Sequence, residues 1–323
     1  MKVLITGGAG FLGRRLATKL LSLGELTGPS GQREPIDELV LLDIVEAAGF
    51  DDARVTTLVG DIAARAVLER AIDTQTRAIF HLAAIVSGQA EADFELGMRI
   101  NLEASRMLLE VCRALGHRPR VVFTSSVAVY GGKVPDVVRD DTALNPQTSY
   151  GAQKAIGELL LSDYSRRGFV DGRALRLPTI SVRPGRPNAA ASSFASGIIR
   201  EPLNGEEAMC PVPLDTRLWL LSPRAVIDAL VMGGEIDGAA LGERRTVNLP
   251  GLSVSVADMI AALREVAGDD VAARIRHHID PRLTAMVRSW PGEWDTSRAL
   301  ALGFTGDATF ADVIRAYIAD EKR

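Results

Sequence analysis

The chain has few residues of the types that build disulfide frameworks and metal sites. Among its 323 residues there are two cysteines, Cys112 and Cys210, and four histidines. Two cysteines so far apart predict neither a disulfide framework nor a cysteine-rich zinc site, and they suit a reducing compartment. His81 follows an apolar run, and His277 and His278 are adjacent, so the histidines form no ligand cluster and we expect no metal.

Strong net charge and long apolar stretches are also missing. The formal net charge is -4, which gives no general attraction to nucleic acid or anionic lipid. No apolar run is long enough to cross a membrane, and no basic segment precedes the first run, KVLIT. We therefore expect a cytoplasmic protein that binds neither nucleic acid nor membrane. With 47% hydrophobic residues, the chain can bury a sizeable core.

Short apolar runs alternate with helical patterns along the first half of the chain. The runs predict buried strands at 2–6, 39–43, 55–61, 78–84, 120–126 and 172–182. The intervening patterns predict helices at 13–23, 64–72, 92–115 and 150–165. This alternation is typical of α/β proteins with a doubly wound parallel sheet and right-handed crossovers. The proline- and glycine-rich stretch 27–35 predicts a surface loop.

The pattern becomes less regular after Pro178. Turn signals and proline-punctuated extended segments follow, and amphipathic helices are predicted at 257–268 and 308–323. We therefore expect two domains. Residues 1–178 would form the doubly wound domain, and residues 179–323 would mainly form a smaller α/β substrate domain, with some segments returning to the first core.

Glycines connect the first strand to the first helix. Gly8, Gly10 and Gly13 satisfy G-x-G-x-x-G, and Gly7, Gly10 and Gly13 satisfy G-x-x-G-x-x-G. Such glycines permit a tight turn and let a pyrophosphate approach backbone N–H groups at the helix N-terminus. A tight turn without a ligand is the alternative. The strand–turn–helix context favours the dinucleotide-binding interpretation.

Acidic residues follow the second and third predicted strands. Asp43 would accept hydrogen bonds from the adenosine ribose hydroxyls and repel a 2′-phosphate, which favours NAD over NADP. Asp43 lies further from the glycine motif than the roughly 20 residues usual in dinucleotide-binding folds, and the 27–35 segment accounts for the extra length. Asp61 would bind the adenine amino group, unless it is simply an exposed aspartate at a strand end.

Tyr150 and Lys154 stand four residues apart on a predicted helix, downstream of the strand end VVFTSS. A lysine ammonium beside a phenol favours the phenolate and would lower a pKa that is ordinarily near 10. Ser126 would orient a substrate oxygen and stabilise its developing charge. The alternative is a surface tyrosine with a solvated lysine. The glycine loop earlier in the chain disfavours it, since the loop and this triplet together are the parts that a dehydrogenase needs.

These motifs resemble the extended short-chain dehydrogenase/reductase family, which has the Rossmann fold and includes nucleotide-sugar epimerases. The resemblance covers almost the whole chain and rests on TGGAGFLG, LLDI, GDI, HLAA, the TSS strand end and the Tyr150/Lys154 pair. It implies that Ser126, Tyr150 and Lys154 are the catalytic triad. Ser126 is preferred to Ser125 because it lies four residues before Tyr130, as in the family's S-x-x-x-Y-G pattern.

The resemblance also implies which residues line an NAD groove. They are Gly7, Gly10, Phe11, Leu12, Gly13, Asp43, Ile44, Asp61, Ile62, Leu82, Ala83, Ala84, Tyr150, Lys154, Pro178 and Ile180. Asn101 matches an asparagine on the helix behind the site, where the family uses it mainly structurally. The family further implies a homodimer, formed through the helices near 92–115 and 150–166.

Departures from the family pattern indicate the subgroup. Val127 and Ala128 follow Ser126, where 4,6-dehydratases carry an acid pair, so that chemistry is disfavoured. The epimerases' N-x-Y-G-P-type segment is replaced at 178–197 by small residues and arginines. The second half is similar to that of D-erythronate dehydrogenases, which oxidise the C2 hydroxyl of a four-carbon sugar acid with NAD.

The similarity predicts an NAD-dependent dehydrogenase acting on a small hydroxy acid, D-erythronate at C2. The acid's carboxylate needs a cation, and an arginine fork suits it, so Arg183 and Arg217 are candidates. Asn188, Ser192 and Ser193 could bind the hydroxyls. Either arginine could instead form a surface salt bridge.

Two other functions compete with this prediction. A nucleotide-sugar epimerase would hold its NAD tightly, produce no net NADH and need a cavity with room for a nucleotide. A non-enzymatic NAD-sensing protein is the second alternative, but such proteins often lose the tyrosine or the lysine, and this chain retains both.

Overall fold

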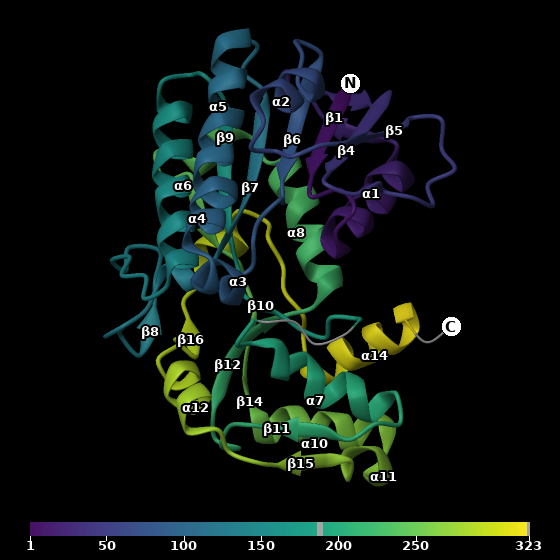
Figure 1. Cartoon of the computed structure of the whole chain (residues 1–323), viewed down its shortest axis with the longest axis vertical. Helices are drawn as coiled ribbons and strands as arrows, with labels where there is room; N and C mark the ends of the chain where they lie inside the picture. Colours follow the sequence, from purple (N-terminus) through teal and green to yellow (C-terminus); the bar gives the residue numbers. More distant parts are fainter. Residues whose placement is uncertain (186–189, 322–323) are drawn as a thin grey trace.

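A seven-stranded parallel sheet forms the centre of the upper part of the molecule (Figure 1). In the computed structural model, which describes residues 1–185 and 190–321, the prediction of a doubly wound parallel sheet is confirmed. The strands lie in the order β13 (Thr246–Asn248), β9 (Asp171–Leu177), β7 (Arg120–Ser126), β6 (Thr76–His81), β1 (Lys2–Thr6), β4 (Glu38–Asp43) and β5 (Val55–Val59).

Helices cover both faces of this sheet because its strands are apolar on both sides. Successive residues of β1 point to opposite faces: Val3 and Ile5 belong to one core, and Leu4 to another. The first core is covered by α1 (Phe11–Leu23), α8 (Pro223–Glu235), α9 (Gly238–Leu241) and α13 (Ser297–Ala301). The second is covered by α2 (Arg65–Ala71), α5 (Ala104–Leu115) and α6 (Ser149–Arg166).

A smaller α/β unit lies at the opposite end of the molecule (Figure 1). Its strands are β10 (Thr179–Ile180), β12 (Arg217–Leu221) and β14 (Leu252–Ser255) in one sheet, and β11 (Ala208–Cys210) and β15 (Ile275–His277) in another. Its helices are α7 (Ser193–Leu203), α10 (Val256–Ala267), α11 (Asp269–Ala272), α12 (Pro281–Arg288) and α14 (Phe310–Glu321). The domain boundary between residues 178 and 179 stays a prediction.

The predicted surface loop at 27–35 contains strand structure instead. β2 (Glu25–Thr27) pairs antiparallel with β3 (Arg33–Pro35), and the two glycines and Pro29 lie in the turn between them. The prediction of a loop was wrong for the residues that form these strands, and the neighbouring Leu26 anchors the hairpin because it is fully buried in the first core. Arg33 also pairs with Glu25 and with Glu235 of α8, which fixes the hairpin to the body of the sheet.

The long helix predicted for 92–115 is divided into shorter segments. α3 (Ser87–Ala92) and α4 (Phe94–Gly97) precede a π-helical segment, Met98–Glu103, which leads into α5. The π-helical segment holds Asn101, whose side chain bonds both backbone groups of Ile85 and the side chain of Gln153. The remaining short elements are a 3₁₀ turn at Val127–Val129, β8 (Val137–Val138) and β16 (Glu293–Trp294).

The strand predicted for 172–182 is interrupted at Pro178. β9 ends at Leu177 in the seven-stranded sheet, whereas Thr179 and Ile180 pair with β12 in the smaller unit. Proline has no N–H for a sheet ladder, so the backbone changes sheets at this residue.

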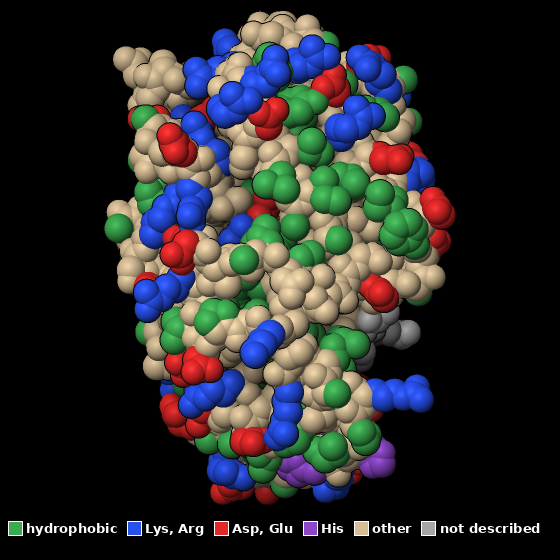
Figure 2. Space-filling view, turned by 90° about the vertical axis from the view of Figure 1, so that its left-hand side faces the viewer, with side chains coloured by type: hydrophobic (Ala, Val, Ile, Leu, Met, Phe, Trp, Pro, Cys, Tyr) green, Lys and Arg blue, Asp and Glu red, His purple; other side chains and the backbone are tan. Residues whose placement is uncertain are grey.

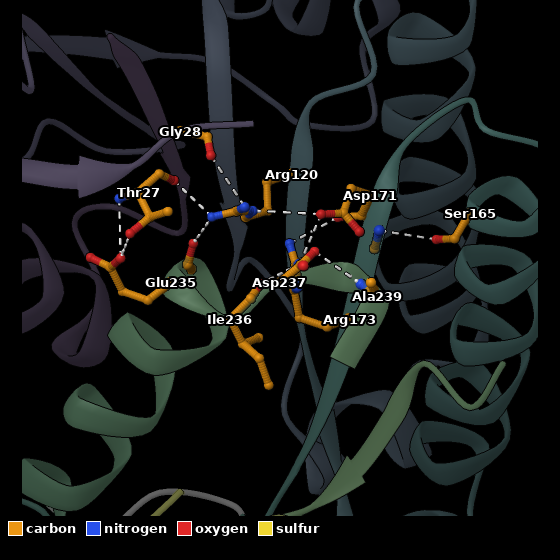
Figure 3. A network of polar contacts seen from close by, with 12 residues as sticks. Thr27, Gly28, Arg120, Ser165, Asp171, Arg173, Glu235, Ile236, Asp237 and Ala239 are labelled. Carbon is orange, nitrogen blue, oxygen red and sulfur yellow. Dashed lines mark hydrogen bonds and ion pairs between the residues drawn. The ribbon is translucent and has the colours of Figure 1, made fainter. Parts of the chain in front are cut away.

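Three arginines converge on Asp171 at the amino ends of the strands, and Figure 3 shows two of them, Arg120 and Arg173. Arg173 and Arg245 donate to the carboxylate at 2.9 and 3.0 Å, and Arg120 lies 3.6 Å from it. Arg120 also donates to the carbonyl of Gly234 near the C-terminus of α8, at 2.6 Å. Arg173 is fully buried and Arg120 nearly so, and burying an unpaired charge is costly. The negative charge of Asp171 therefore offsets the cost of burying these two arginines.

We expect Asp171→Asn to lower the free energy of unfolding by about 3 kcal/mol, because it leaves buried cations without a counter-charge. Urea unfolding would measure the loss. Asp163→Asn is the matched control, since Asp163 pairs with the exposed Arg166 and the change should be small. Equal effects of the two substitutions would contradict the expectation.

Candidate active site

Two cavities meet at Tyr150. The first, of about 650 Å³, lies beyond the carboxyl ends of β1, β4 and β6. The second, of about 630 Å³, lies between the start of α6 and the smaller unit. Tyr150 lines both cavities. The first cavity occupies the point where strand order reverses around β1, which is where doubly wound sheets place their ligands.

The structure brings together almost all the residues predicted to line a dinucleotide groove. Those lining the first cavity are Gly7, Gly10, Phe11, Leu12, Gly13, Asp43, Ile44, Asp61, Ile62, Leu82, Ala83, Ala84, Tyr150, Lys154 and Ile180. Pro178 is the exception: it lines neither cavity.

The glycine loop is packed too closely for side chains. A Cβ at Gly13 would lie 2.1 Å from the carbonyl oxygen of Gly7, and one at Gly7 would lie 2.9 Å from the backbone nitrogen of Ala83. Gly7 also has a positive φ of 72°. Helix α1 begins at Phe11 with no side chain capping its N-terminus. Its first N–H groups therefore face the cavity as an anion site of the kind that binds pyrophosphate.

Carboxylates stand at the far end of the first cavity. Asp43 accepts hydrogen bonds from the backbone N–H groups of Ala9 and Ile44, at 3.0 and 2.7 Å. Asp61 accepts from the N–H of Ala63 and pairs with Arg99. Burial opposes ionisation of Asp61, but these two hydrogen bonds hold its pKa below the ordinary value. Asp61 is therefore charged at neutral pH.

Residues of α6 meet consecutive residues at the end of β7. Thr148 caps the helix by accepting from the N–H of Gly151, which sets where α6 begins. The phenol of Tyr150 lies beside the Ser126 hydroxyl, which favours the ionised form of the phenol. One turn later, Lys154 Nζ donates to the carbonyl oxygen of Thr124 at 2.8 Å and lies 5.6 Å from the centre of the Tyr150 ring.

Burial dominates the ionisation of both side chains. It raises the pKa of Tyr150 to about 12, although the hydroxyl of Ser126 and the charge of Arg183 act in the opposite direction. It lowers the pKa of Lys154 to about 7, against the attraction of Glu158. The expected lowering of the Tyr150 pKa is therefore not seen, because burial outweighs the groups that favour the phenolate.

The residues predicted to hold a substrate are divided between the cavities. Arg183 and Ser193 line the first cavity with Tyr150, and Ser192 lines the second with Ser126. Arg217 lines neither: it is exposed, and its guanidinium donates to Ser253 Oγ of β14 at 3.2 Å. Asn188 lies outside the described residues.

The sequence comparison assigns the family. The model of the NAD dependent epimerase/dehydratase family matches residues 3–220, which is more than half of the chain. The chain belongs to this family. Its Gly7–Gly13 loop and the Tyr150/Lys154 pair both lie within the matched region.

Relatives match this member of the family over its full length. A D-erythronate dehydrogenase from Cupriavidus necator is 67% identical, covering 99% of this chain and 98% of the relative. A D-erythronate dehydrogenase from Haemophilus influenzae is 46% identical, covering 98% and 99%. The crystal structure of the nucleoside-diphosphate-sugar epimerase from Agrobacterium tumefaciens is 45% identical, with a TM-score of 0.94 over 100% of this chain and 94% of that one.

Sequence reasoning missed several polar residues around the site. Arg99 lines the first cavity and pairs with Asp61, although no local motif marks it. Glu158 and Arg176 form a buried ion pair behind Lys154. The spacing of four residues from Lys154 to Glu158 was visible in the sequence. The contribution of Arg176 from β9 was not, because only the fold brings it to α6.

Among residues 1–185 and 190–321, no group of three or more His, Cys, Asp or Glu side chains is placed to hold a metal ion. No helix in these ranges is long and apolar enough to cross a bilayer.

The pKa of Lys154 predicts a pH dependence of stability. The group titrates near 7 in the folded protein and near 10.5 when unfolded, so the unfolded chain binds more protons between these values. The contribution of Lys154 to the free energy of unfolding should therefore increase from pH 7 to pH 10. Lys154→Met removes this rise, which is measured as the difference between the two proteins' urea unfolding curves. Parallel pH profiles of the two proteins would contradict the expectation.

Proposed function

We propose that this chain oxidises D-erythronate at the C2 hydroxyl to 2-oxo-D-erythronate, with NAD as the hydride acceptor. The observation that carries the proposal is the full-length similarity to two D-erythronate dehydrogenases. The position of Ser126 and Tyr150 on the wall of the second cavity supports it, because a hydroxyl substrate there reaches both side chains. Because Tyr150 borders both cavities, a cofactor in the first and a substrate in the second would meet at this side chain.

The first cavity fits NAD. The side-chain-free loop at Gly7 and Gly13 and the uncapped start of α1 suit the pyrophosphate. Asp43 would accept hydrogen bonds from the ribose hydroxyls, and its negative charge would disfavour the 2′-phosphate of NADP. When bound, the cofactor supplies the acceptor for the hydride that leaves C2.

The chain's own residues would handle the proton. Ser126 would donate a hydrogen bond to the substrate oxygen, and the Tyr150 phenolate would accept the proton of the C2 hydroxyl as the carbonyl forms. Because burial raises the pKa of Tyr150, Lys154 and Arg183 must offset that burial by placing positive charge near the phenol. These roles for Ser126, Tyr150 and Lys154 are part of the proposal.

Of the two candidate arginines, Arg183 is the one the geometry favours for the substrate carboxylate. It is half-buried, lines the same cavity as Tyr150, and its charge acts on the phenol. Arg217 points along β14 instead, held by Ser253. A guanidinium close to the reacting centre can hold the carboxylate of a 2-hydroxy acid next to its C2 carbon.

Nucleotide-sugar epimerisation is the second candidate, and the size of the second cavity favours it. A volume of about 630 Å³ exceeds the needs of a four-carbon acid and lies in the range of drug-sized ligands. Its described lining, however, contains no lysine or arginine, and its charged residue is Glu91. A nucleoside diphosphate extending through this cavity would therefore meet no cation in its described lining, whereas the carboxylate of a small acid held at Tyr150 would be next to Arg183 of the first cavity.

A homodimer through α5 and α6 stays a prediction. Figure 2 views the molecule from the side of these helices and shows apolar side chains gathered among charged ones on its upper half. On α6, Leu159 is 67% exposed and Ile156 is 40% exposed. An apolar face of this kind suits contact with a second copy of the chain.

Purified protein with NAD and D-erythronate should form NADH steadily, measured at 340 nm, whereas L-threonate, D-threonate and UDP-sugars should not. Interconversion of a UDP-sugar without net NADH would instead establish the epimerase.

Tyr150→Phe should retain binding of NADH, measured by fluorescence, and lose nearly all turnover, because the group that accepts the proton is gone. Normal turnover of the Tyr150→Phe variant would refute the assigned base.

Arg183→Met should raise KM for D-erythronate tenfold or more, since a charge-assisted hydrogen bond to the carboxylate is lost. Arg217→Met is the matched control and should leave KM within twofold of the unchanged protein. Steady-state kinetics with D-erythronate as the varied substrate would measure both. A larger effect at Arg217 would reverse the assignment.

A further inference from the structure

Helix α6 contacts the end of β7 at three successive turns. Tyr150 lies beside Ser126, and Lys154 donates to the carbonyl oxygen of Thr124. At the third turn, Glu158 Oε1 accepts from Ser125 Oγ at 2.5 Å. The proposed catalytic side chains account for the first two contacts. The third contains a buried carboxylate to which the proposed reaction assigns no role.

Glu158 is held in place by a fork from the next strand. Arg176 of β9 donates to its two carboxylate oxygens at 2.8 and 2.6 Å. Glu158 is 2% exposed and Arg176 is 4% exposed, so water screens neither charge. On its other side, Arg176 donates to the phenol of Tyr130 and lies 3.3 Å from Asn248 Oδ1. The carboxylate is therefore fixed from both β7 and β9.

Lys154 has few other groups to offset its burial. The titratable groups that face it are Tyr150 and Glu158 on its own helix and His81 on β6. His81 is buried between Thr6 and Ser105, and burial lowers its pKa to about 3, so it carries no charge at neutral pH. Tyr150 is protonated there as well. Glu158 thus supplies the negative charge that attracts the ammonium of Lys154.

We infer that Glu158 is a positioning residue for the reaction: it holds the ammonium form of Lys154 beside Tyr150, and Arg176 sets how much of its negative charge Lys154 feels. This inference deepens the proposed function and rests on Lys154 acting there as a cation. Glu158 and Arg176 carry opposite buried charges, so removing them should shift the pKa of Lys154 in opposite directions. Loss of Glu158 should lower it, and loss of Arg176 should raise it.

The first test follows Lys154 directly, without substrate or cofactor. Lysine side chains labelled with ¹⁵N are titrated by NMR, and the Nζ signal of Lys154 is assigned by its loss in Lys154→Met. Glu158→Gln should lower the pKa of Lys154 by about one unit or more, since the attracting charge is gone. Arg176→Met should raise it, because Glu158 is then no longer neutralised.

Matched variants separate charge from packing. Arg176→Lys keeps the positive charge and should leave the pKa of Lys154 close to that of the unchanged protein. Glu69→Gln removes a surface carboxylate, paired with Arg65 on α2, and should also have no effect. Urea unfolding of each variant reports whether it is folded. If Glu158→Gln does not fold, the upward shift in Arg176→Met decides the inference alone.

The second test is the pH dependence of kcat/KM with D-erythronate. The fall in activity at high pH should move to lower pH in Glu158→Gln and to higher pH in Arg176→Met, following the NMR titration. Shifts in the same direction, or no shift of Lys154 in either variant, would overturn the inference. If the NMR shifts appear and no variant oxidises D-erythronate, the proposed substrate fails and the role of Glu158 stands.

Discussion

The site depends on a buried ion pair that touches neither cavity. Glu158 and Arg176 join α6 to β9, and Ser125 joins the same carboxylate to β7. Such a pair gains little net stability, because the desolvation of both charges offsets their attraction. It does impose a strict geometry, since either charge alone would be costly to bury. The rotation and height of α6 against the sheet, and with them the placement of Tyr150, are therefore fixed by electrostatics as well as by apolar packing.

The two cavities differ in the charged side chains that line them. The first is lined by Asp43, Asp61, Arg99 and Arg183, which suits a ligand with phosphates, ribose hydroxyls and a polar base. The second is lined mainly by hydroxyl, aromatic and small side chains among the described residues, including Ser126, Ser192, Trp219 and Trp290. Tyr150 stands where these two environments meet. A charged intermediate of the reaction would thus face its cations on the side of the first cavity.

Local motifs made much of this site predictable from the sequence. The loop from Gly7 to Gly13 and the pair Tyr150 and Lys154 are each set by a few adjacent residues, so spacing alone indicates their geometry. Arg176 and Glu158 could not be paired in this way, because they meet only through the packing of a strand against a helix. The position of Arg217 outside both cavities could not be predicted for a similar reason: the sequence does not tell which way a strand-end side chain points.

Pro178 gives the molecule a mechanical property. It separates β9, in the seven-stranded sheet, from β10, in the smaller unit, so at this crossing the two sheets are joined by a single residue spanning about 4 Å on each side. The chain crosses again between β12 and α8 and between β13 and β14, so a rotation of one unit against the other must bend several short connections, Pro178 among them. Ile180 of the first cavity and Thr179 of the second follow it directly. A rotation at Pro178 would therefore move the walls of both cavities at the same time.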